Sequence, residues 1–325
     1  MRTVRGAGRA LAGRRARFTD DLTAERFLRG NVHTHSSASD GTASTEAMVG
    51  WYRDHGYQFI AMTEHNLRLD AVALAAAAAA APMILIPGEE VTDTLRRLPL
   101  HVNALCATGT VGGDHDFDRA DVGLASMFAA IHAQGGIPIV NHPNFHWALT
   151  ADSIARGASG RYLFEVWSGH PNVAPGGDGA HPSAEAIWDE LLARGEDAFP
   201  VAVDDAHGLP DDPAGGDALP GRAWVETFGD ERTPEAICAA LGAGHLYASS
   251  GPEVSRIVVH EDTFAIAVTD SRATIAFVGE RGELLAQAGA DATYRLGGGE
   301  ALVRARITGG DGRHAWTAAY RVEAR

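Results

Sequence analysis

The chain has 325 residues, of which 45% are hydrophobic and 21% are charged. This length and composition are typical of a globular protein with one large and one smaller domain, and they exclude a disordered chain. Asp and Glu outnumber Lys and Arg by 42 to 27, and the resulting net charge of −15 argues against nucleic-acid polymers and anionic membranes as partners, because both bind basic surfaces.

The basic residues are all of one kind. All 27 are Arg, and the sequence contains no Lys. This excludes Schiff-base catalysis and a phosphate-binding loop with an essential Lys. It also excludes metal sites that are built on a carboxylated Lys.

Hydrophobic patterning predicts that short strands alternate with helices from residue 30 to about residue 245. Repeated strand–helix units form parallel sheets, and about seven of them favour a closed barrel over an open sheet. The sequence therefore predicts an α/β fold with a TIM-like (β/α)7 barrel. The predicted strands are 31–35, 59–63, 83–87, 101–106, 137–141, 162–167 and 199–204. The predicted helices are 45–55, 70–81, 120–134 and 184–194.

After this region the pattern changes to short alternating segments that are separated by turns containing Gly or Asp. Such a pattern predicts a small antiparallel β-sandwich, joined to the barrel by a helix at 234–242 and a turn at 249–252. The predicted division is an N-terminal arm at 1–27, a barrel at 28–245 and a C-terminal β-domain at 246–325.

Targeting signals and cysteines indicate the compartment. Cys106 and Cys238 both lie in apolar patterns, and we predict that each is a small buried core residue, because two cysteines are too few for a disulfide scaffold. The first 18 residues carry six Arg but lack the apolar region of a signal peptide. The Ala-rich stretch at 71–87 is broken by Pro82 and predicts a helix followed by a strand, so we expect a cytoplasmic protein.

Ionisable side chains stand at the ends of six of the seven predicted strands. In a (β/α) barrel these ends converge on one mouth. Alternate residues of a strand face the same side, so His33 can share an ion with His35, and Asp205 with His207. Imidazole and carboxylate ligands without thiolate suit Zn, Mn or Fe, and the pattern predicts a site with two to three divalent ions. The residues are His33, His35, Asp40, His65, Glu89, Glu90, His101, His142, Asp204, Asp205 and His207.

The segments that carry these residues resemble the polymerase and histidinol phosphatase (PHP) family of metal-dependent phosphoesterases. The resemblance covers about residues 28–210, and the segments are GNVHTHSSASDG (30–41), GYQFIAMTEHN (56–66), IPGEEV (86–91), LHVNAL (100–105), NHPN (141–144), EVWSG (165–169) and VAVDDAH (201–207). It implies a distorted (β/α)7 barrel with a three-metal cluster. The C-terminal segment is similar to the β-domain of a branch that includes carbamate-ester hydrolases.

The resemblance also implies which residue holds which ion. The implied ligands are His33, His35, Glu90 and Asp205 for the first metal, Glu90, His101 and His142 for the second, and Asp40, His65 and His207 for the third. Where the family has Asp before the second-strand His, this sequence has Glu64. The doublets leave Glu89 and Asp204 open as ligands, with Glu90 preferred by the Gly-x-Glu pattern and Asp205 by the Asp-x-His spacing.

A cluster of this kind predicts hydrolysis of a small phosphorylated substrate. Three divalent ions, less three carboxylates and a bridging hydroxide, leave roughly +2, which suits a phosphate ester attacked by that hydroxide. His207 or His170 could protonate the leaving oxygen. Arg222 is a candidate for binding the phosphate; alternatively, it is an exposed residue on a strand. Trp167 is a candidate for lining the pocket; alternatively, it is a core residue.

Two other functions stay open at this point. The same cluster could hydrolyse a carbamate or carboxylic ester, which the β-domain favours, or it could stabilise a binding module without catalysis. An amidohydrolase also begins with His-x-His, but it needs a bridging Lys that this sequence lacks. The oligomeric state is open as well, with a homo-oligomer formed through the β-domain as one alternative.

Overall fold

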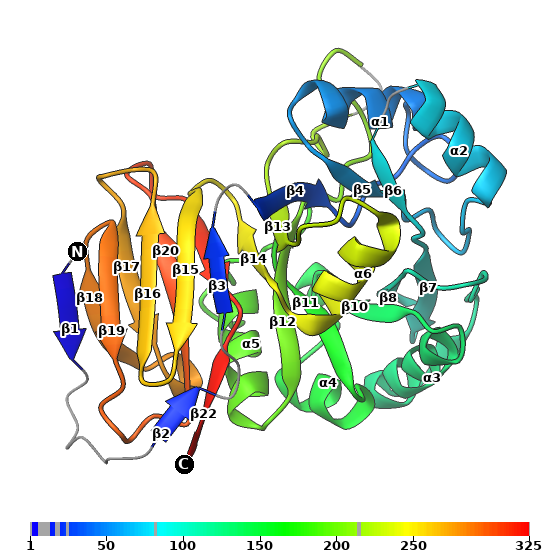
Figure 1. Cartoon of the computed structure of the whole chain (residues 1–325). Helices are drawn as coiled ribbons and strands as arrows, with labels where there is room; N and C mark the ends of the chain where they lie inside the picture. Colours follow the sequence, from blue (N-terminus) through cyan, green and yellow to red (C-terminus); the bar gives the residue numbers. More distant parts are fainter. Residues whose placement is uncertain are drawn as a thin grey trace.

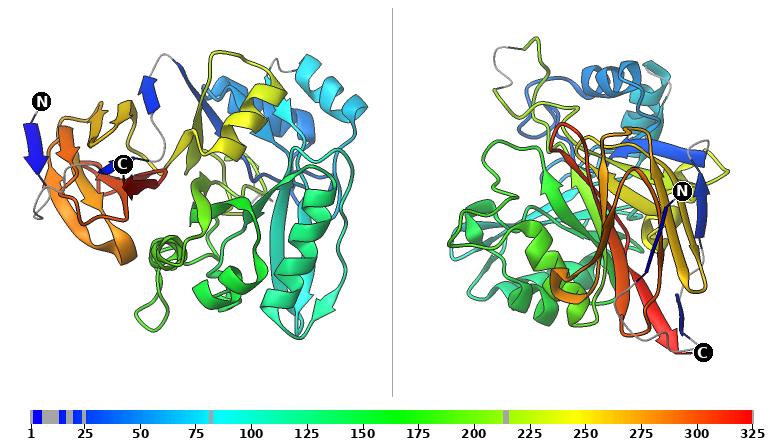
Figure 2. Two further views of the ribbon diagram at one scale, coloured as in Figure 1. Left: turned by 60° about the horizontal axis from the view of Figure 1, so that its bottom comes forward. Right: turned by 90° about the vertical axis from the view of Figure 1, so that its left-hand side faces the viewer.

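The computed structural model describes residues 2–5, 14–16, 20–23, 26–80, 83–212 and 216–324 (Figure 1). The described chain has two lobes. The α/β lobe comprises residues 26–249, and the β-lobe comprises residues 250–324 together with the three strands that precede residue 24. The first and last described strands both belong to the β-lobe, as all three ribbon views show (Figures 1 and 2).

One sheet of the α/β lobe contains both parallel and antiparallel strands. Its order is β12 (Asp197–Val203), β11 (Arg161–Ser168), β10 (Ile137–Val140), β8 (Leu98–Leu105), β7 (Glu90–Leu95) and β9 (Asp116–Phe117). Strands β10, β11 and β12 are parallel, whereas β8 is antiparallel to both of its neighbours. The near-continuous apolar sequences of β10 and β12 fit strands buried on both faces.

The second sheet begins in the α/β lobe and continues into the β-lobe. Parallel strands β6 (Ile84–Ile86), β5 (Phe59–Ala61) and β4 (Phe27–Asn31) lead to antiparallel β13 (Trp224–Phe228) and β14 (Leu246–Ser249). Strand β14 pairs with β21 (His314–Thr317), and the order then runs through β20 (Leu302–Thr308), β17 (Thr274–Val278) and β18 (Leu284–Ala288).

The mixed α/β architecture is confirmed, but a closed seven-stranded barrel is not found among the described strands. The strands of the α/β lobe form two open sheets, joined at the strand ends by two isolated bridges, Thr34 to Ala206 and His65 to Glu90. The reason lies in strands that do not belong to strand–helix units: β7 and β8 form a hairpin, and β13 follows a loop.

The remaining strands complete a β-sandwich. A five-stranded sheet has the order β1 (Arg2–Arg5), β19 (Asp291–Arg295), β16 (Thr263–Val268), β15 (Val254–His260) and β3 (Asp20–Thr23). Strand β22 (Tyr320–Ala324) pairs with β20 and with β2 (Arg14–Ala16). The alternating pattern of these strands places Ile257, Phe277 and Tyr294 in a core with no exposure to solvent. The predicted arm at 1–27 thus supplies strands to the β-lobe, and the division into domains stays a prediction.

Helices cover the outer faces of the sheets in the α/β lobe (Figure 1). Their bounds are α1 Thr45–Asp54, α2 Ala71–Ala80, α3 Ala120–Ala133, α4 Ala151–Gly157, α5 Ala184–Ala193 and α6 Pro234–Ala243. Capping fixes several of these starts, because the side chains of Ser44, Ser183 and Thr233 each accept a backbone N–H of the first turn. The short helix α4 was not predicted.

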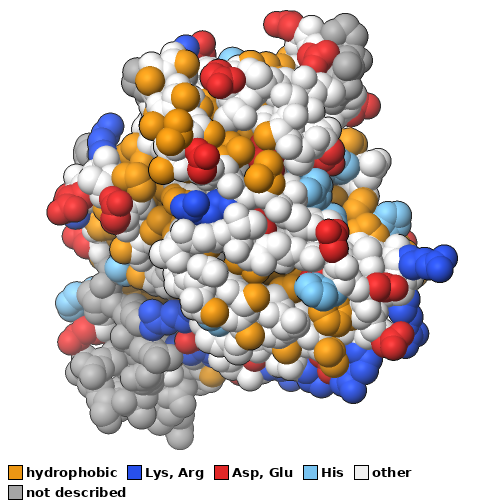
Figure 3. All heavy atoms as spheres, turned by 90° about the vertical axis from the view of Figure 1, so that its right-hand side faces the viewer, with side chains coloured by type: hydrophobic (Ala, Val, Ile, Leu, Met, Phe, Trp, Pro, Cys, Tyr) orange, Lys and Arg blue, Asp and Glu red, His pale blue; other side chains and the backbone are white. Residues whose placement is uncertain are grey.

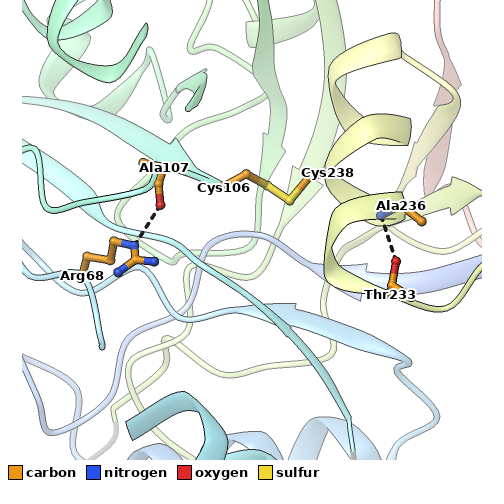
Figure 4. The surroundings of a disulfide bond; sticks show 6 residues. All are labelled: Arg68, Cys106, Ala107, Thr233, Ala236 and Cys238. Atoms are coloured by element: carbon orange, nitrogen blue, oxygen red, sulfur yellow. Dashed lines mark hydrogen bonds between the residues drawn. A yellow bond between two sulfur atoms is a disulfide. The ribbon is translucent and has the colours of Figure 1, made fainter. Parts of the chain in front are cut away.

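The two cysteines form a disulfide bond (Figure 4). It joins the residue after β8 to helix α6, across 132 positions of sequence. As predicted, Cys106 and Cys238 pack against the core, although they are only partly buried. The bond between them was not predicted, because their contact depends on tertiary structure that no local pattern reveals. Disulfides are rare in reducing compartments, and the cytoplasmic localisation stays a prediction.

Two properties of the whole described chain bear on its surroundings. None of the described helices has the length and apolar character that a bilayer-spanning segment requires. On the face shown in Figure 3, acidic side chains are scattered among hydrophobic and uncharged atoms, and the largest group of basic side chains lies toward one edge.

Candidate metal centre

The predicted ligands meet at the end of the α/β lobe where the parallel strands terminate. Backbone hydrogen bonds tie the segments that follow β4 and β12: the His35 N–H donates to the Ala206 carbonyl at 2.9 Å, and the Asp205 N–H donates to the His33 carbonyl at 3.1 Å. Because β4 ends at Asn31, both histidines lie beyond the strand and not within it as predicted. Asp205 has a φ of 50°, a conformation that is uncommon for residues other than glycine and that recurs at functional sites.

Glu90 lies at the centre of this cluster, with a side chain that is 1% exposed. Its two oxygens face different imidazole rings, so this carboxylate is placed to bridge two ions. Oε1 lies 3.3 Å from His33 Nε2, 2.9 Å from His101 Nδ1 and 3.5 Å from His142 Nε2. Oε2 lies 3.2 Å from His35 Nε2 and 3.2 Å from His65 Nδ1.

Two further carboxylates lie close to imidazole nitrogens of the cluster, and Asp205 shares two of these nitrogens with Glu90. Asp205 Oδ1 lies 3.2 Å from His33 Nε2 and 3.4 Å from His35 Nε2. Asp40 Oδ2 lies 3.3 Å from His65 Nε2 and 3.5 Å from His207 Nε2. The structure therefore brings all nine predicted ligands together.

The chemistry of these donors fits divalent metal ions. Four buried nitrogens lie near carboxylate oxygens but make no well-formed hydrogen bond: His33 Nε2, both nitrogens of His35, and His101 Nδ1. An unpaired buried polar atom is costly, and coordination of a metal removes that cost. Two donors on one ion, each about 2.1 Å away from it, lie roughly 3.0–3.4 Å apart, which agrees with most of the separations above.

The donors form four overlapping groups, each with atoms that lie within 4.8 Å of one another. These groups do not coincide with the three implied ligand sets. His35, for example, belongs to the group that contains Asp40 and also to the group that contains Asp205. The groups are His35, Asp40, His65 and His207; His33, Glu90 and His142; His33, His35 and Asp205; and His65, Glu90 and His101.

The buried charges of the centre perturb one another strongly. Burial raises the pKa of Glu90, but the effect of His101 and His33, which lower it, is larger. The pKa of Glu90 therefore lies well below its usual range. Burial lowers the pKa of His35, but the carboxylates of Asp205 and Glu90 raise it, to about 10. The carboxylates thus demand positive charge nearby, which protons on the imidazoles or metal ions can supply.

Glu165 on β11 holds two of the ligands in place and was not assigned a role from the sequence. Its Oε1 lies 2.6 Å from His33 Nδ1, and its Oε2 accepts the His142 backbone N–H at 2.7 Å. Because a carboxylate only accepts, His33 carries its proton on Nδ1 and directs Nε2 toward the cluster. The only sequence signal for Glu165 was its place in a segment that resembles the family.

The neighbouring carboxylates at the two doublets point elsewhere. Glu89 accepts the backbone N–H groups of Val111 and Gly112, both at 2.7 Å. Asp204 accepts backbone N–H groups from the segment that follows the 208–221 loop and the hydroxyl of Tyr52 at 2.8 Å. Both residues therefore shape the loops around the centre and do not contact its ligands.

Glu64 stands where the family has Asp. Its carboxylate accepts the Ser36 backbone N–H at 3.1 Å and hydroxyl hydrogen bonds from Ser36 and Ser39. It therefore orders the loop that carries Asp40.

The centre opens into a cavity of about 310 Å³. Four residues besides the ligands line it, and only one of them, His170, was predicted as a site residue. The lining residues are Asp40, His65, Glu90, His101, His142, Phe145, His170, Asn172, Val173, Asp205 and His207. Phe145, Asn172 and Val173 were missed because a single aromatic, apolar or amide residue in a loop carries no chemical signal in a single sequence.

The structure places the two predicted substrate-binding residues outside this cavity. The Arg222 guanidinium donates to the Gly169 carbonyl at 3.0 Å. Trp167 is partly buried and packs against Trp316 of the main hydrophobic core, with ring centroids 6.2 Å apart. Neither residue is among those that line the cavity.

The fold and the donor cluster define a mixed α/β protein with a candidate polynuclear metal centre. Among solved structures, a two-domain protein from Bacteroides vulgatus ATCC 8482 that contains a predicted PHP-like metal-dependent phosphoesterase is similar over 97% of this chain and 100% of that chain, with a TM-score of 0.53 and 16% identity. This similarity shows that the two chains share a fold across both lobes.

Another structure is similar over a smaller part. An amidohydrolase from Chromobacterium violaceum, with bound sulfate and no metal, matches 56% of this chain and 89% of that chain, with a TM-score of 0.41 and 17% identity. Comparison of the sequence with models of protein families and with curated proteins gives no match.

Proposed function

We propose that this protein is a metal-dependent hydrolase that cleaves phosphoester bonds of small substrates. The observation that carries the proposal is the convergence of nine imidazole and carboxylate side chains, four of whose buried nitrogens make no well-formed hydrogen bond, at an open cavity. Bound divalent ions supply Lewis-acid polarisation of a phosphoryl group and lower the pKa of a coordinated water.

The protein's own residues position the donors and the substrate. The centre carries three carboxylates, and the described residues that line its cavity include no guanidinium group, so bound metal ions would hold a phosphoryl anion there. Glu165 and the backbone bonds between the strand-end segments hold the ligands in register, which keeps the donor geometry fixed during turnover.

His170 is better placed than His207 to donate a hydrogen bond to the leaving oxygen. His207 Nδ1 lies 3.0 Å from the Asp205 carbonyl oxygen, and its Nε2 faces Asp40. His170 Nδ1 accepts the Asn172 backbone N–H at 3.2 Å, so the neutral ring carries its proton on Nε2. Burial lowers the pKa of His170, which favours this neutral form.

The test is a comparison of substrates with one metal-loaded preparation. Metal content is measured by elemental analysis, and turnover is measured with an aryl phosphate, an aryl phosphodiester, an aryl carbamate and an aryl acetate. We expect about two or more equivalents of metal and release of phosphate. Both should be lost in His142→Ala. Both should be retained in the control variant His132→Asn, because His132 is exposed on α3.

Two outcomes would replace this proposal. Turnover of the carbamate or acetate without turnover of either phosphate ester would assign the same centre to carbon esters. Full metal loading with no turnover of any substrate would favour a metal-stabilised binding module.

A further inference from the structure

One wall of the metal cavity is apolar. It is formed by Phe145 and Val173, and the Phe145 ring centroid lies 5.2 Å from that of His142 and 6.4 Å from that of His101. A group attached to a phosphoryl held at the centre would therefore meet an aromatic surface on this side. His170, the hydrogen-bond donor proposed above, lies on the same wall, with its centroid 6.4 Å from that of Phe145.

The backbone that carries Phe145 is held in an uncommon conformation. Phe145 begins a 3₁₀ turn, Phe145–Trp147, in which His146 and Trp147 have φ values of 51° and 56°. Two consecutive residues with positive φ cost conformational energy, and such strain clusters at functional sites. The strain is thus maintained at the point where the chain passes the cavity.

Contacts to the 171–182 loop hold this turn. The Asn144 side-chain amide donates to the Ala174 carbonyl at 2.8 Å and to the Pro182 carbonyl at 3.1 Å. Trp147 stacks on His181, with centroids 4.1 Å apart and ring planes 7° apart. Because the loop also carries Val173, the two halves of the apolar wall are fastened to each other.

The cavity offers no charged partner for a second anionic group. No Arg is among its described lining residues, and the sequence contains no Lys. The Arg222 guanidinium, the predicted phosphate ligand, is engaged with the Gly169 carbonyl. The rim instead carries Asp40, a candidate metal ligand whose side chain is 51% exposed and which offers no positive charge of its own.

We infer that the substrate carries a single phosphoryl group on an uncharged leaving group with an aromatic or apolar face, which packs against Phe145 and Val173. This inference rests on the proposed function, because the metal centre must hold the phosphoryl group. It assigns specificity to the wall of the cavity and not to a basic residue.

The test measures binding of non-hydrolysable phosphonates to the Zn²⁺-loaded protein by titration calorimetry. Phenylphosphonate should bind about tenfold more tightly than methylphosphonate, since an aromatic pair and the burial of a ring contribute on this order. A carboxylate in the para position of the phenyl ring should remove most of this preference. Phe145→Ala should bring the phenyl-to-methyl ratio close to one, and Phe145→Leu should retain part of it.

Metal content and melting temperature of the variants show whether the centre is intact. Equal binding of phenyl- and methylphosphonate by the unmodified protein would overturn the inference while leaving the proposed function in place. Tighter binding of the carboxylated ring would overturn it in the same way. Binding of neither phosphonate by fully loaded protein would overturn both.

Discussion

Replacement of Glu165 by Gln tests whether this buried carboxylate controls metal affinity. The change keeps the size of the side chain but removes its charge and turns one accepting atom into a donor. Glu165 accepts from His33 Nδ1 at 2.6 Å and from the His142 N–H at 2.7 Å. A Gln amide can satisfy only one of these donors, and it places its own N–H groups against the other.

The magnitude follows from the contact that is lost. A hydrogen bond to a charged group contributes about 1.5–3 kcal/mol, and loss of a residue that orients a metal ligand typically lowers metal affinity about 10- to 100-fold. We therefore expect Glu165→Gln to weaken Zn²⁺ binding by roughly that factor, with a smaller effect on folding.

The assay is competition for Zn²⁺ with a chromophoric chelator. Glu196→Gln is a matched control, because Glu196 accepts from the hydroxyl of Tyr162 and has no contact with the ligands. Affinity of Glu165→Gln within twofold of the unmodified protein would refute the reasoning, and so would an equal loss of affinity in the control.

Three further predictions concern stability and protons. Arg304 is 1% exposed and donates twice to Asp189 at 2.8 Å, so Arg304→Ala should lower the free energy of unfolding by about 3–5 kcal/mol. With an unfolding entropy of about 2.1 cal/mol/K per residue, this loss lowers the melting temperature by roughly 4–7 °C. A change under about 1 °C would contradict the prediction. Reduction of the Cys106–Cys238 bond frees a loop of 132 positions and should lower the free energy of unfolding by up to about 5 kcal/mol; thiols that react with Ellman's reagent in native, unreduced protein would refute the premise. Burial lowers the pKa of His35, but the neighbouring carboxylates raise it to about 10, so the metal-free site holds protons below that pH. Metal binding should release these protons, and metal affinity should fall as the pH falls. Calorimetric binding enthalpies that do not vary with the ionisation enthalpy of the buffer would contradict this prediction.

The candidate site was predicted more completely than the fold around it. Strand ends such as TEHN and NHPN combine an apolar run with an ionisable residue, and this local signal survives even though the strands do not close into a barrel. The Gly-x-Glu pattern of the family that the sequence resembles favoured Glu90 over Glu89 as a ligand, which agrees with the contacts that the two side chains make.

The parts that were missed depend on tertiary structure or on unusual turns. Strands β7 and β8 are joined by Arg96 and Arg97, with φ values of 49° and 69°. Both φ values fall in the region that two-residue hairpins require, but such turns usually contain Asn or Gly, so the Arg-Arg pair carries no hairpin signal. The disulfide, the contacts of Glu165 and the wall of Phe145 join segments that are distant in sequence, and local patterns along the chain do not predict such contacts.

The pairing of β14 with β21 has a practical consequence for protein engineering. Tyr247 and Thr317 are register partners in a sheet that crosses from one lobe to the other. Ending the chain near residue 245 would remove β14 and leave β13 as an unpaired edge strand. It would also remove Arg304, the buried ion-pair partner of Asp189. Bare edges recruit other strands and aggregate. Crystallographers or enzymologists who seek a minimal catalytic fragment should therefore retain the C-terminal lobe.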